Sequence, residues 1–436
     1  MKGRIFFEID FVILFAVLGL VITGILFIYS SGISSEGDLI STEYRRQIIW
    51  VSIGLILVFA ISVFNYKRVY DFSVYIYLGT IALLVATILL GRFVYGSRWI
   101  RIGFFGFQAS EFAKIATILF LAWYLDSRKR SQGVFVHFIV SCIIALLPMA
   151  LILFQPDLGT ALVFIPILLG MTYIAGMPMR YIIFIVLCIA FTGILLVLPL
   201  WQTSIMNNAF PALMALVNMR FVIAACMILA LILAIAVFGL FRFKKRYFYW
   251  ISYLAGISIF ALGASFVVGR VLREYQIMRL IVFIDPNVDP RGFGWQIIQS
   301  TTAIGSGGPF GRGFLQGTQS HYHFLPEQST DFIFSILSEE WGFLGGIFLF
   351  ALFLTVLLRL IRIMRITNDS FGSYIVAGLI SMYAFHFIIN VGMTMGIMPI
   401  TGIPLLFVSY GGSAMVSAMV GIGFACSIHA RRYLQS

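Results

Sequence analysis

The strongest constraint on the fold is a succession of apolar runs, each about 20 residues long, that begins near residue 10 and continues almost to the C-terminus. A helix of about 20 residues is what crossing the hydrocarbon core of a bilayer requires. Of the 436 residues, 61% are hydrophobic and 11% are charged, and the mean hydropathy of +1.03 excludes a soluble globular protein. Because the alternating pattern of an outer-membrane barrel is absent, the sequence predicts an all-α polytopic membrane protein.

Twelve membrane-spanning helices are predicted. Their expected ranges are 10–30, 47–65, 72–91, 108–125, 134–153, 158–176, 181–200, 221–241, 247–269, 333–358, 372–394 and 403–428. The first run follows Lys2 and Arg4 but continues to about Tyr29 without a small-residue cleavage site, so a retained helix is expected in place of a signal peptide. All four cysteines lie inside apolar runs and are predicted to be packed thiols, neither disulfides nor metal ligands.

The distribution of Lys and Arg predicts how the chain is oriented. The loops that would share one side hold seventeen of the 29 basic residues and five of the 17 acidic residues, a net charge of +12 that equals the formal charge of the whole chain. Basic loops face the cytoplasm, so both termini are expected there. The charge therefore reflects topology and not nucleic-acid binding. The opposite side carries the three longer connections, 31–46, 92–107 and 270–332.

The segment DPRGFGWQIIQSTTAIGSGG, residues 289–308, is a polar and glycine-rich exception within this apolar chain. It lies in some sixty residues, from Arg270 to about Phe332, that contain no apolar run of membrane length. Asp289 is followed by a proline, which fixes one backbone dihedral, and by Gly292 and Gly294, which permit close backbone approach. The Asp289 carboxylate is therefore expected to be held on a turn.

Two other patterns in this region are candidates for ligand sites. The run GSGGPFGRG offers backbone N–H groups that could surround an anion. It has neither the glycine spacing of a dinucleotide-binding loop nor the Gly-Lys-Ser/Thr of a Walker A loop, so no nucleotide cofactor is expected. The tripeptide HYH at 321–323 lacks a third ligand at metal-binding spacing, so no zinc site is predicted.

Basic residues on the predicted external side are candidates for binding an anion such as a phosphate. Arg98 and Arg101 lie in the connection 92–107, where the insertion rule disfavours positive charge. The connection 270–332 carries five more: Arg270, Arg273, Arg279, Arg291 and Arg312. The alternative for each is a structural ion pair or a contact with a lipid headgroup.

Charged residues at membrane depth cost roughly 2.5–3.5 kcal/mol each, so each of them calls for a reason. Glu111 and Lys114 are three residues apart on one helix face and can pair, either as a structural pair or as the lining of a polar cavity. Asp157 lies between two spans and either caps the next helix or faces the same cavity. Glu339 and Glu340 are expected to open the helix after the long connection, one of them near its positive end and the other able to line the site.

These features leave an enzyme, a transporter and a scaffold open. Transporters usually place charged groups at the bilayer midplane on broken helices. Here the richest chemistry lies in an extramembrane connection, which favours catalysis on a lipid-anchored substrate. A flippase would use the Glu111–Lys114 pair, and Asp289 would then have no chemical role.

The polar segment and its surroundings resemble the SEDS (shape, elongation, division and sporulation) family. The motifs that carry the resemblance are GSRWIRIGFFGFQASEFAK, QPDLGTALV, the stretch from FIDPNVDPRGFG to EEWGFLGG, and NVGMTMGIMPITGIPLLFVSYGGSAM. They cover most of the chain apart from roughly 201–268. The two successive Asp-Pro pairs, AIGSGG, GTQS and GIPL are similar to the elongation members, and Thr401 stands where division members carry a lysine.

The resemblance implies a peptidoglycan glycosyltransferase of the bacterial cytoplasmic (inner) membrane that polymerises lipid II into glycan strands during cell elongation. Undecaprenyl pyrophosphate would leave, with inversion at the anomeric carbon. Asp289 would be the essential loop aspartate, either the general base for the acceptor sugar 4-hydroxyl or a ligand of a divalent cation, Mg²⁺ or Mn²⁺, on the pyrophosphate. The implied partner is a class B penicillin-binding protein, the crosslinking transpeptidase. The rival roles are a lipid II flippase and a non-catalytic scaffold for that transpeptidase.

A set of substrate or cavity residues is expected beside Asp289. Its members, which lie on family positions around a central cavity or on the external and polar segments, are Trp99, Arg98, Arg101, Glu111, Lys114, Asp157, Gln299 and Ser300. Arg98, Arg101 or Lys114, or a metal ion, would offset the charge of the departing pyrophosphate.

The predicted twelve spans exceed the ten of the family pattern. The segment 201–269 is therefore expected to be a two-helix insertion within a single SEDS-like domain of residues 1–436, followed by a large extracytoplasmic loop, 270–332, before the last three helices. Because two inserted spans are an even number, they preserve the orientation of everything that follows. No function is assigned to the insertion.

Overall fold

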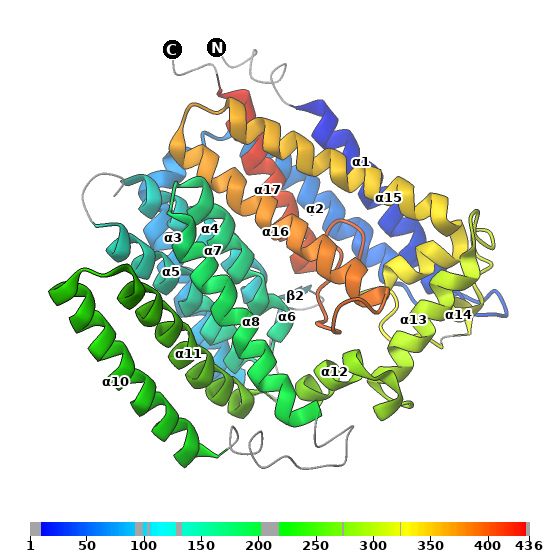
Figure 1. Cartoon of the computed structure of the whole chain (residues 1–436). Helices are drawn as coiled ribbons and strands as arrows, with labels where there is room; N and C mark the ends of the chain where they lie inside the picture. The colour runs from blue at the N-terminus through cyan, green and yellow to red at the C-terminus, as the bar shows by residue number, and fades with distance from the viewer. Residues whose placement is uncertain are drawn as a thin grey trace. The chain divides into compact units, whose positions relative to one another are not determined.

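A computed structural model describes residues 10–91, 99–102, 105–127, 133–201, 218–272, 274–322 and 324–432 (Figure 1). Within these ranges, ten helices are long and apolar enough to cross a membrane. They are α1 (Phe11–Ser31), α2 (Glu43–Val63), α3 (Arg68–Gly91), α5 (Val134–Phe154), α8 (Met179–Trp201), α10 (Met219–Phe243), α11 (Arg246–Val271), α15 (Ile333–Ile366), α16 (Ser370–Thr394) and α17 (Gly412–Ala430). The predicted all-α multi-pass fold is confirmed, with one two-stranded ribbon, β1 (Ile100–Ile102) against β2 (Phe105–Phe107), as the addition.

The described residues form two compact units. One consists of Met1–Gly176 together with Trp295–Ser436, and the other is Met177–Gly294.

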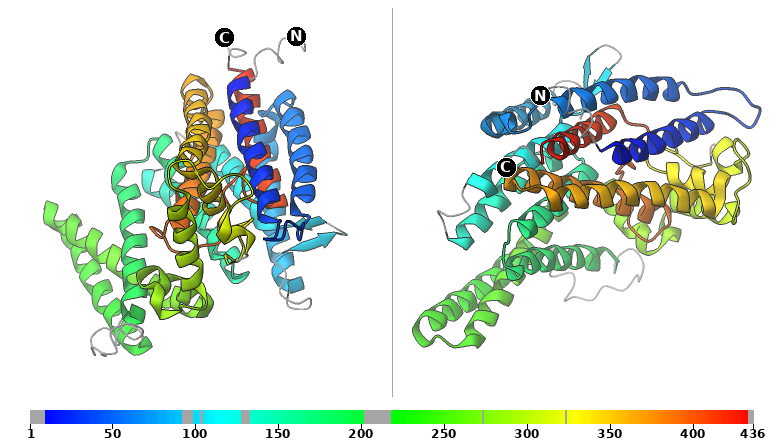
Figure 2. Two further views of the ribbon diagram at one scale, coloured as in Figure 1. Left: turned by 90° about the vertical axis from the view of Figure 1, so that its right-hand side faces the viewer. Right: turned by 90° about the horizontal axis from the view of Figure 1, so that it is seen from above.

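The first unit is built around α17. Of the most apolar 18 residues of α17, 89% are buried, whereas the corresponding share for α10 of the other unit is 11%. The helix α17 is therefore a core helix and not a lipid-facing one. Small residues allow this close packing. A Cβ at Gly423 would lie 2.9 Å from the Ile61 Cβ, and a Cβ at Gly54 would lie 2.8 Å from Met419. Figure 2 shows α17 between α2 and the pair formed by α15 and α16.

One end of this unit gathers charged groups with buried partners. Asp10 caps α1 and receives the Arg359 guanidinium at 2.6 Å (Nη2) and 2.7 Å (Nε). Arg431, just after α17, donates to the Ser62 carbonyl at 3.0 Å. The start of α1 and the end of α17 therefore lie at the same end of the unit, as Figure 1 also shows.

Nine predicted spans coincide with nine of the ten described helices of membrane length to within eight residues at either end, the largest difference being that α15 ends at Ile366 and not at 358. The other three differ in detail. The prediction 108–125 is α4 (Ala109–Ser127). The prediction 158–176 is divided into α6 (Leu158–Leu162) and α7 (Phe164–Ile174), since Pro166 has no N–H for the Leu162 carbonyl. The prediction 403–428 was wrong over its first turns, because the helix begins only at Gly412. The preceding residues 400–408 are non-helical and mostly buried.

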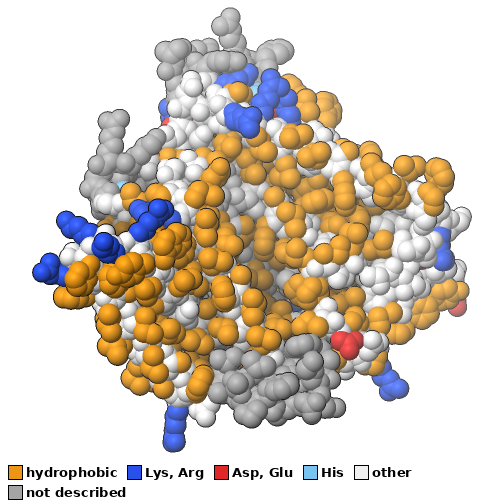
Figure 3. Space-filling model, viewed as in Figure 1, with side chains coloured by type: hydrophobic (Ala, Val, Ile, Leu, Met, Phe, Trp, Pro, Cys, Tyr) orange, Lys and Arg blue, Asp and Glu red, His pale blue; other side chains and the backbone are white. Residues whose placement is uncertain are grey.

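The second unit packs α11 against both α10 and α8. The helices α10 and α11 form an antiparallel hairpin, and the Phe248 ring fills the space at Gly239, where a Cβ would lie 2.5 Å from it. Large apolar side chains such as Phe238, 67% exposed, face outward as in a lipid-exposed helix. Figure 3 shows hydrophobic side chains over most of the face in view, with Lys and Arg towards its margins. That this hairpin is an insertion into the family pattern stays a prediction.

The predicted loop 270–332 contains several helices that are too short to cross a membrane. They are α12 (Glu274–Ile284), the 3₁₀ turn η4 (Pro286–Val288), α13 (Phe293–Gly307) and α14 (Thr318–His321). A search for membrane-length apolar runs does not detect helices this short. The sequence therefore predicted only that the segment is polar.

Candidate active site

Asp289 lies between η4 and α13 on a turn made by its own backbone. Its carbonyl oxygen accepts from the amides of Gly292 at 3.3 Å and Gly294 at 3.1 Å. Its carboxylate oxygen Oδ2 accepts from the Phe293 amide at 2.9 Å, at the positive end of α13. The side chain is partly exposed. The expected turn-held carboxylate is thus present, with one oxygen anchored.

The two glycines after Asp289 have distinct steric roles. A Cβ at Gly292 would lie 2.1 Å from the Asp289 Oδ2 atom, whereas a Cβ at Gly294 would lie 2.0 Å from the Pro286 carbonyl oxygen. Gly292 therefore makes room for the carboxylate, and Gly294 makes room for the backbone of the turn. Neighbouring Asp285 caps η4 by accepting from the Asn287 amide at 2.9 Å, so its carboxylate is engaged locally.

A guanidinium lies beside the same turn. The Arg279 side chain, from α12, lies 5.0 Å from the centroid of the Phe293 ring and 5.7 Å from that of Tyr275. Since the Phe293 amide binds the Asp289 carboxylate, α12 brings positive charge next to the start of α13.

In the first unit, Glu111 and Lys114 form the ion pair that their spacing predicted. The Lys114 Nζ atom lies 2.8 Å from Glu111 Oε2, and both side chains are almost completely buried. Lys114 also lies 3.1 Å from Nε2 of His386, a residue of α16. The Ser417 hydroxyl of α17 donates to the Glu111 carbonyl at 2.9 Å. Three helices thus meet at one buried charged group.

Asp157 caps α6, which was one of its two predicted roles. Its Oδ1 atom accepts from the Thr160 amide at 3.2 Å, and its Oδ2 atom accepts from the Gln108 side chain at 2.9 Å. Gln108 directly precedes α4, and its backbone N–H donates to the Ser413 hydroxyl of α17 at 3.0 Å. Gln108 and Ser413, which the sequence did not single out, therefore link Asp157 to the helix that carries Glu111.

The remaining expected residues fall in different places. Trp99 is 41% exposed and its ring covers Gly106 of β2, where a Cβ would lie 3.2 Å away. Arg101 lies on β1 opposite Gly106, and Arg98 lies outside the described residues. On α13, Gln299 is partly buried, whereas Ser300 is fully buried.

Ser300 acts as a packing contact between helices. Its hydroxyl donates to the Thr394 carbonyl of α16 at 2.6 Å and lies 2.6 Å from the Ser335 hydroxyl of α15. In the glycine-rich run that follows, the amides of Gly311, Arg312 and Gly313 donate to carbonyls, those of Gly307, Glu339 and Glu340. These three N–H groups are therefore used within the protein and do not form the anion cradle considered from the sequence.

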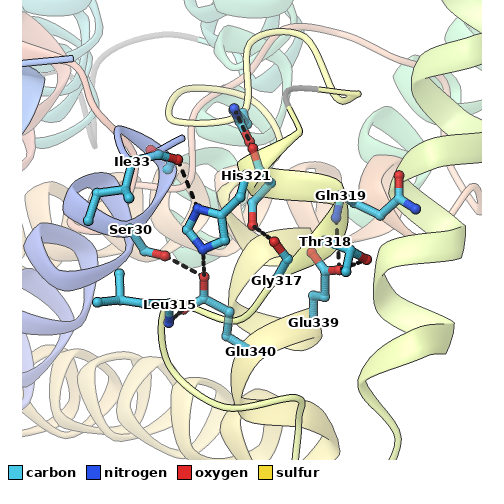
Figure 4. A network of polar contacts seen from close by, with 12 residues as sticks. Ser30, Ile33, Leu315, Gly317, Thr318, Gln319, His321, Glu339 and Glu340 are labelled. Carbon is cyan, nitrogen blue, oxygen red and sulfur yellow. Dashed lines mark hydrogen bonds and ion pairs between the residues drawn. The ribbon is translucent and has the colours of Figure 1, made fainter. Parts of the chain in front are cut away.

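Glu339 and Glu340 form a buried network with the residues that follow this run (Figure 4). Glu340 accepts from the Ser30 hydroxyl of α1 and, at 3.1 Å, from the Leu315 amide. Glu339 accepts from the Gln319 amide at 3.0 Å. The expectation that they open a helix was wrong, because α15 begins at Ile333 and they are its seventh and eighth residues, just before a kink at Gly342.

His321 completes this network. Its Nε2 atom lies 3.7 Å from Glu340 Oε1, and its Nδ1 atom lies 2.8 Å from the Ile33 carbonyl oxygen. His323, the other histidine of HYH, lies outside the described residues. Among the residues that the structure describes, no group of three His, Cys, Asp or Glu side chains could hold a metal ion.

The fold and these sites define a multi-pass, all-α membrane protein with a carboxylate on a glycine-shaped turn and a buried ion pair. A family model described as cell cycle protein, that of FtsW, RodA and SpoVE, matches residues 11–208 and 204–434. Peptidoglycan glycosyltransferase RodA of Treponema pallidum is 49% identical over 426 residues, 98% of each chain. The chain therefore belongs to the FtsW/RodA/SpoVE family, the SEDS family, which confirms the predicted resemblance.

Other similar proteins agree. Peptidoglycan glycosyltransferase MrdB of Escherichia coli K12 is 30% identical over 432 residues, 98% of this chain and 95% of the relative. A chain from a peptidoglycan synthase complex, described for its coordination of polymerisation and crosslinking, has a TM-score of 0.68 at 25% identity and covers 98% of this chain and 99% of its own. Rod shape determining protein RodA of Thermus thermophilus has a TM-score of 0.60 at 22% identity, with 98% of each chain covered, a likeness of fold.

Proposed function

We propose that this chain polymerises lipid II into glycan strands, with Asp289 as the residue that activates the acceptor. Its family membership and its 49% identity to a RodA over nearly the full length of both chains make it a peptidoglycan glycosyltransferase. The observation that carries the role of Asp289 is the anchored carboxylate on the Asp-Pro-x-Gly-x-Gly turn. In the described part of the chain, the hydrogen bonds to this carboxylate involve Oδ2, so Oδ1 can take up a proton.

The proposed reaction is an inverting displacement. Asp289 accepts the proton of the acceptor sugar 4-hydroxyl as that oxygen bonds to the anomeric carbon of the lipid-linked donor. The bond from this carbon to undecaprenyl pyrophosphate breaks, and the pyrophosphate leaves with the electron pair. Because pyrophosphate is a good leaving group, the chemistry needs no second carboxylic acid of the kind that glycosidases use.

A divalent cation, Mg²⁺ or Mn²⁺, is compatible with the described residues only as one shared with the substrate. One available carboxylate suits Mg²⁺, which is often held by one or two carboxylates together with substrate phosphates. Asp289 would hold the ion, and the ion would neutralise charge on the pyrophosphate. This is the second proposed role of Asp289.

Arg98, Arg101 and Lys114 are proposed to offset the negative charge of the leaving group. Lys114 is supported by its burial, since a cation in a poorly hydrated site acts on a phosphate more strongly than one in water. Trp99, Glu111, Asp157, Gln299 and Ser300 are proposed to shape or support the substrate cavity. Of these, Asp157 and Ser300 would act through the helices that they fix.

Both termini are proposed to face the cytoplasm, with the segment 270–332 on the outside. Support comes from the first unit, where Asp10, Arg359 and Arg431 gather at one end with the helix ends nearest the termini. The opposite end holds Ser329, whose hydroxyl donates to Glu43 at 2.6 Å. This arrangement agrees with the excess of basic residues in the loops expected inside.

The proposed partner is a class B penicillin-binding protein. Support comes from the similar chain found in a peptidoglycan synthase complex that coordinates polymerisation with crosslinking. The other proposed partners are lipid II, the nascent glycan strand and the membrane lipids around the apolar faces.

The test is glycan synthesis from lipid II by the purified chain with a class B penicillin-binding protein and Mg²⁺ or Mn²⁺. Wild-type protein should form polymer, and Asp289→Ala and Asp289→Asn should not. Equal polymer from Asp289→Ala would exclude the proposed role of this residue. No polymer from any variant, together with lipid II scrambling across liposomes, would replace the proposal with a flippase. No polymer and no scrambling, with the transpeptidase still recruited, would replace it with a scaffold.

A further inference from the structure

His386 lies at the junction of the Lys114 ion pair and a stretch of non-helical backbone. The imidazole is 1% exposed. Its Nε2 atom lies 3.1 Å from Lys114 Nζ of α4, and its Nδ1 atom lies 3.0 Å from the Pro404 carbonyl oxygen. It therefore touches two elements besides its own helix, α16.

These two partners fix the protonation of the ring. A carbonyl oxygen can only accept, so the hydrogen must sit on Nδ1, and Nε2 of the neutral ring is then an acceptor for the Lys114 ammonium. A proton on Nε2 would place a second positive charge 3.1 Å from that ammonium. His386 is thus a neutral acceptor in this arrangement.

The backbone that His386 holds is the non-helical segment 401–405. Asn390, one turn further along α16, donates to the Ile403 carbonyl at 2.8 Å and to the Asp331 carbonyl at 2.9 Å. On another side the segment touches α6, where a Cβ at Gly159 would lie 2.5 Å from the Thr401 carbonyl oxygen. Backbone at membrane depth is tolerated only when protein groups satisfy it, and α16 supplies two such groups here.

The Lys114 ammonium has three N–H donors. Glu111 and His386 lie on two sides of it, at 2.8 Å and 3.1 Å. With these two directions fixed, the tetrahedral geometry of the ammonium fixes the direction of the third N–H. The Glu111 carboxylate balances the positive charge of the Lys114 ammonium. The neutral His386 ring orients the ammonium without adding charge.

We propose that His386 is a positioning residue: it aims the third N–H of Lys114 at the pyrophosphate of the lipid-linked donor and ties that aim to segment 401–405. This inference rests on the proposed function for the identity of the ligand. A histidine that merely satisfies the Pro404 carbonyl would stabilise the fold and leave the action of Lys114 unchanged. The two roles predict different responses to substitution.

The variants are His386→Leu, His386→Gln and the control Tyr383→Phe. Leucine removes both contacts. Glutamine can restore both, because its amide N–H₂ can donate to Pro404 while its carbonyl oxygen accepts from Lys114. Tyr383 lies on the same helix, is fully buried and donates to the Ala418 carbonyl at 2.7 Å. Removal of its hydroxyl therefore shows how much stability and rate are lost when a buried hydrogen bond of α16 is broken.

Purified full-length variants with the class B penicillin-binding protein would be compared for kcat and KM with lipid II, and for Tm. His386→Leu should lower kcat by about 10–100-fold. Tyr383→Phe should show a comparable fall in Tm with near wild-type kcat, and His386→Gln should recover most of the rate. Equal kcat for His386→Leu and Tyr383→Phe would overturn the proposal.

Binding of undecaprenyl pyrophosphate to the same variants, measured by calorimetry, separates this inference from the proposed function. His386→Leu should weaken binding by about tenfold or more, and His386→Gln should not. This difference would support the positioning role even if wild-type protein formed no polymer. Unchanged binding by His386→Leu would overturn the role even if polymer were formed.

Discussion

Gly292→Ala should slow the enzyme about 100-fold while leaving it folded. A Cβ at this position would lie 2.1 Å from the Asp289 Oδ2 atom and 2.7 Å from both Oδ1 and Cγ. Real Cβ contacts are essentially never shorter than 3.0 Å, so the carboxylate must retreat by about 1 Å. The obstacle is the end of a side chain that can rotate, so the backbone has no need to move.

The expected loss of rate follows from that displacement. A misplacement of about 1 Å in a reacting group can cost about 100-fold in rate. The free energy of unfolding should change by less than about 1 kcal/mol, as for most substitutions away from the core. Polymer formation from lipid II would give the rate, and thermal unfolding in detergent would give the stability.

Two other glycines provide the comparison. Gly294→Ala should lose both rate and stability, because its Cβ would lie 2.0 Å from the Pro286 carbonyl oxygen, which is backbone. Gly305→Ala, further along α13 with nothing within 4 Å of its Cβ, should keep its rate and gain up to about 0.5–1 kcal/mol. A folded Gly292→Ala protein with wild-type turnover would refute the reasoning, since the carboxylate position would then not limit the reaction.

Three further predictions concern stability. Gly342→Ala should lower the Tm strongly, because this residue has φ 64° and its Cβ would lie 2.2 Å from the Gly311 amide nitrogen; an unchanged Tm would contradict the kink geometry. Glu340→Gln should cost about 1–3 kcal/mol, because one of the two acceptor oxygens of this buried network becomes an N–H₂ donor; an unchanged Tm would contradict it. Burial, together with the Asp369 charge, raises the pKa of Tyr66 in the folded protein. Stability should therefore fall as the pH rises above about 10, because the tyrosine ionises first in the unfolded chain. Tyr66→Phe should lessen the fall in Tm between about pH 9 and 11.

The membrane helices could be predicted well because length and hydropathy determine them. Shorter features were lost for physical reasons. Pro166 divides α6 from α7 by removing one hydrogen bond, which hydropathy does not register. The segment 400–408 is largely apolar, yet its chain is non-helical: Gly402 has φ 71° and Pro404 has no N–H, while side chains such as Asn390 satisfy its carbonyls. Hydropathy registers neither the two helix-breaking residues nor the tertiary contacts.

The candidate site could be predicted where chemistry was local. The turn at Asp289 and the pairing of Glu111 with Lys114 follow from neighbours within five residues. His386 could not be recognised, because its partners lie 272 and 18 residues away in the sequence. The same holds for Glu340 and Ser30, which are 310 residues apart. A lone polar residue on an apolar helix was the only available signal for His386.

The non-helical segment 401–405 sets an order of events during membrane insertion. Carbonyl groups left bare in hydrocarbon cost several kcal/mol each, so this segment cannot enter the bilayer ahead of its donors. Two of its donors, His386 and Asn390, lie on α16, which leaves the ribosome immediately before the segment. Donors for the carbonyls of the segment are thus already present on the preceding helix. We expect α16 and 401–405 to enter the membrane as one unit, before α17 packs against them.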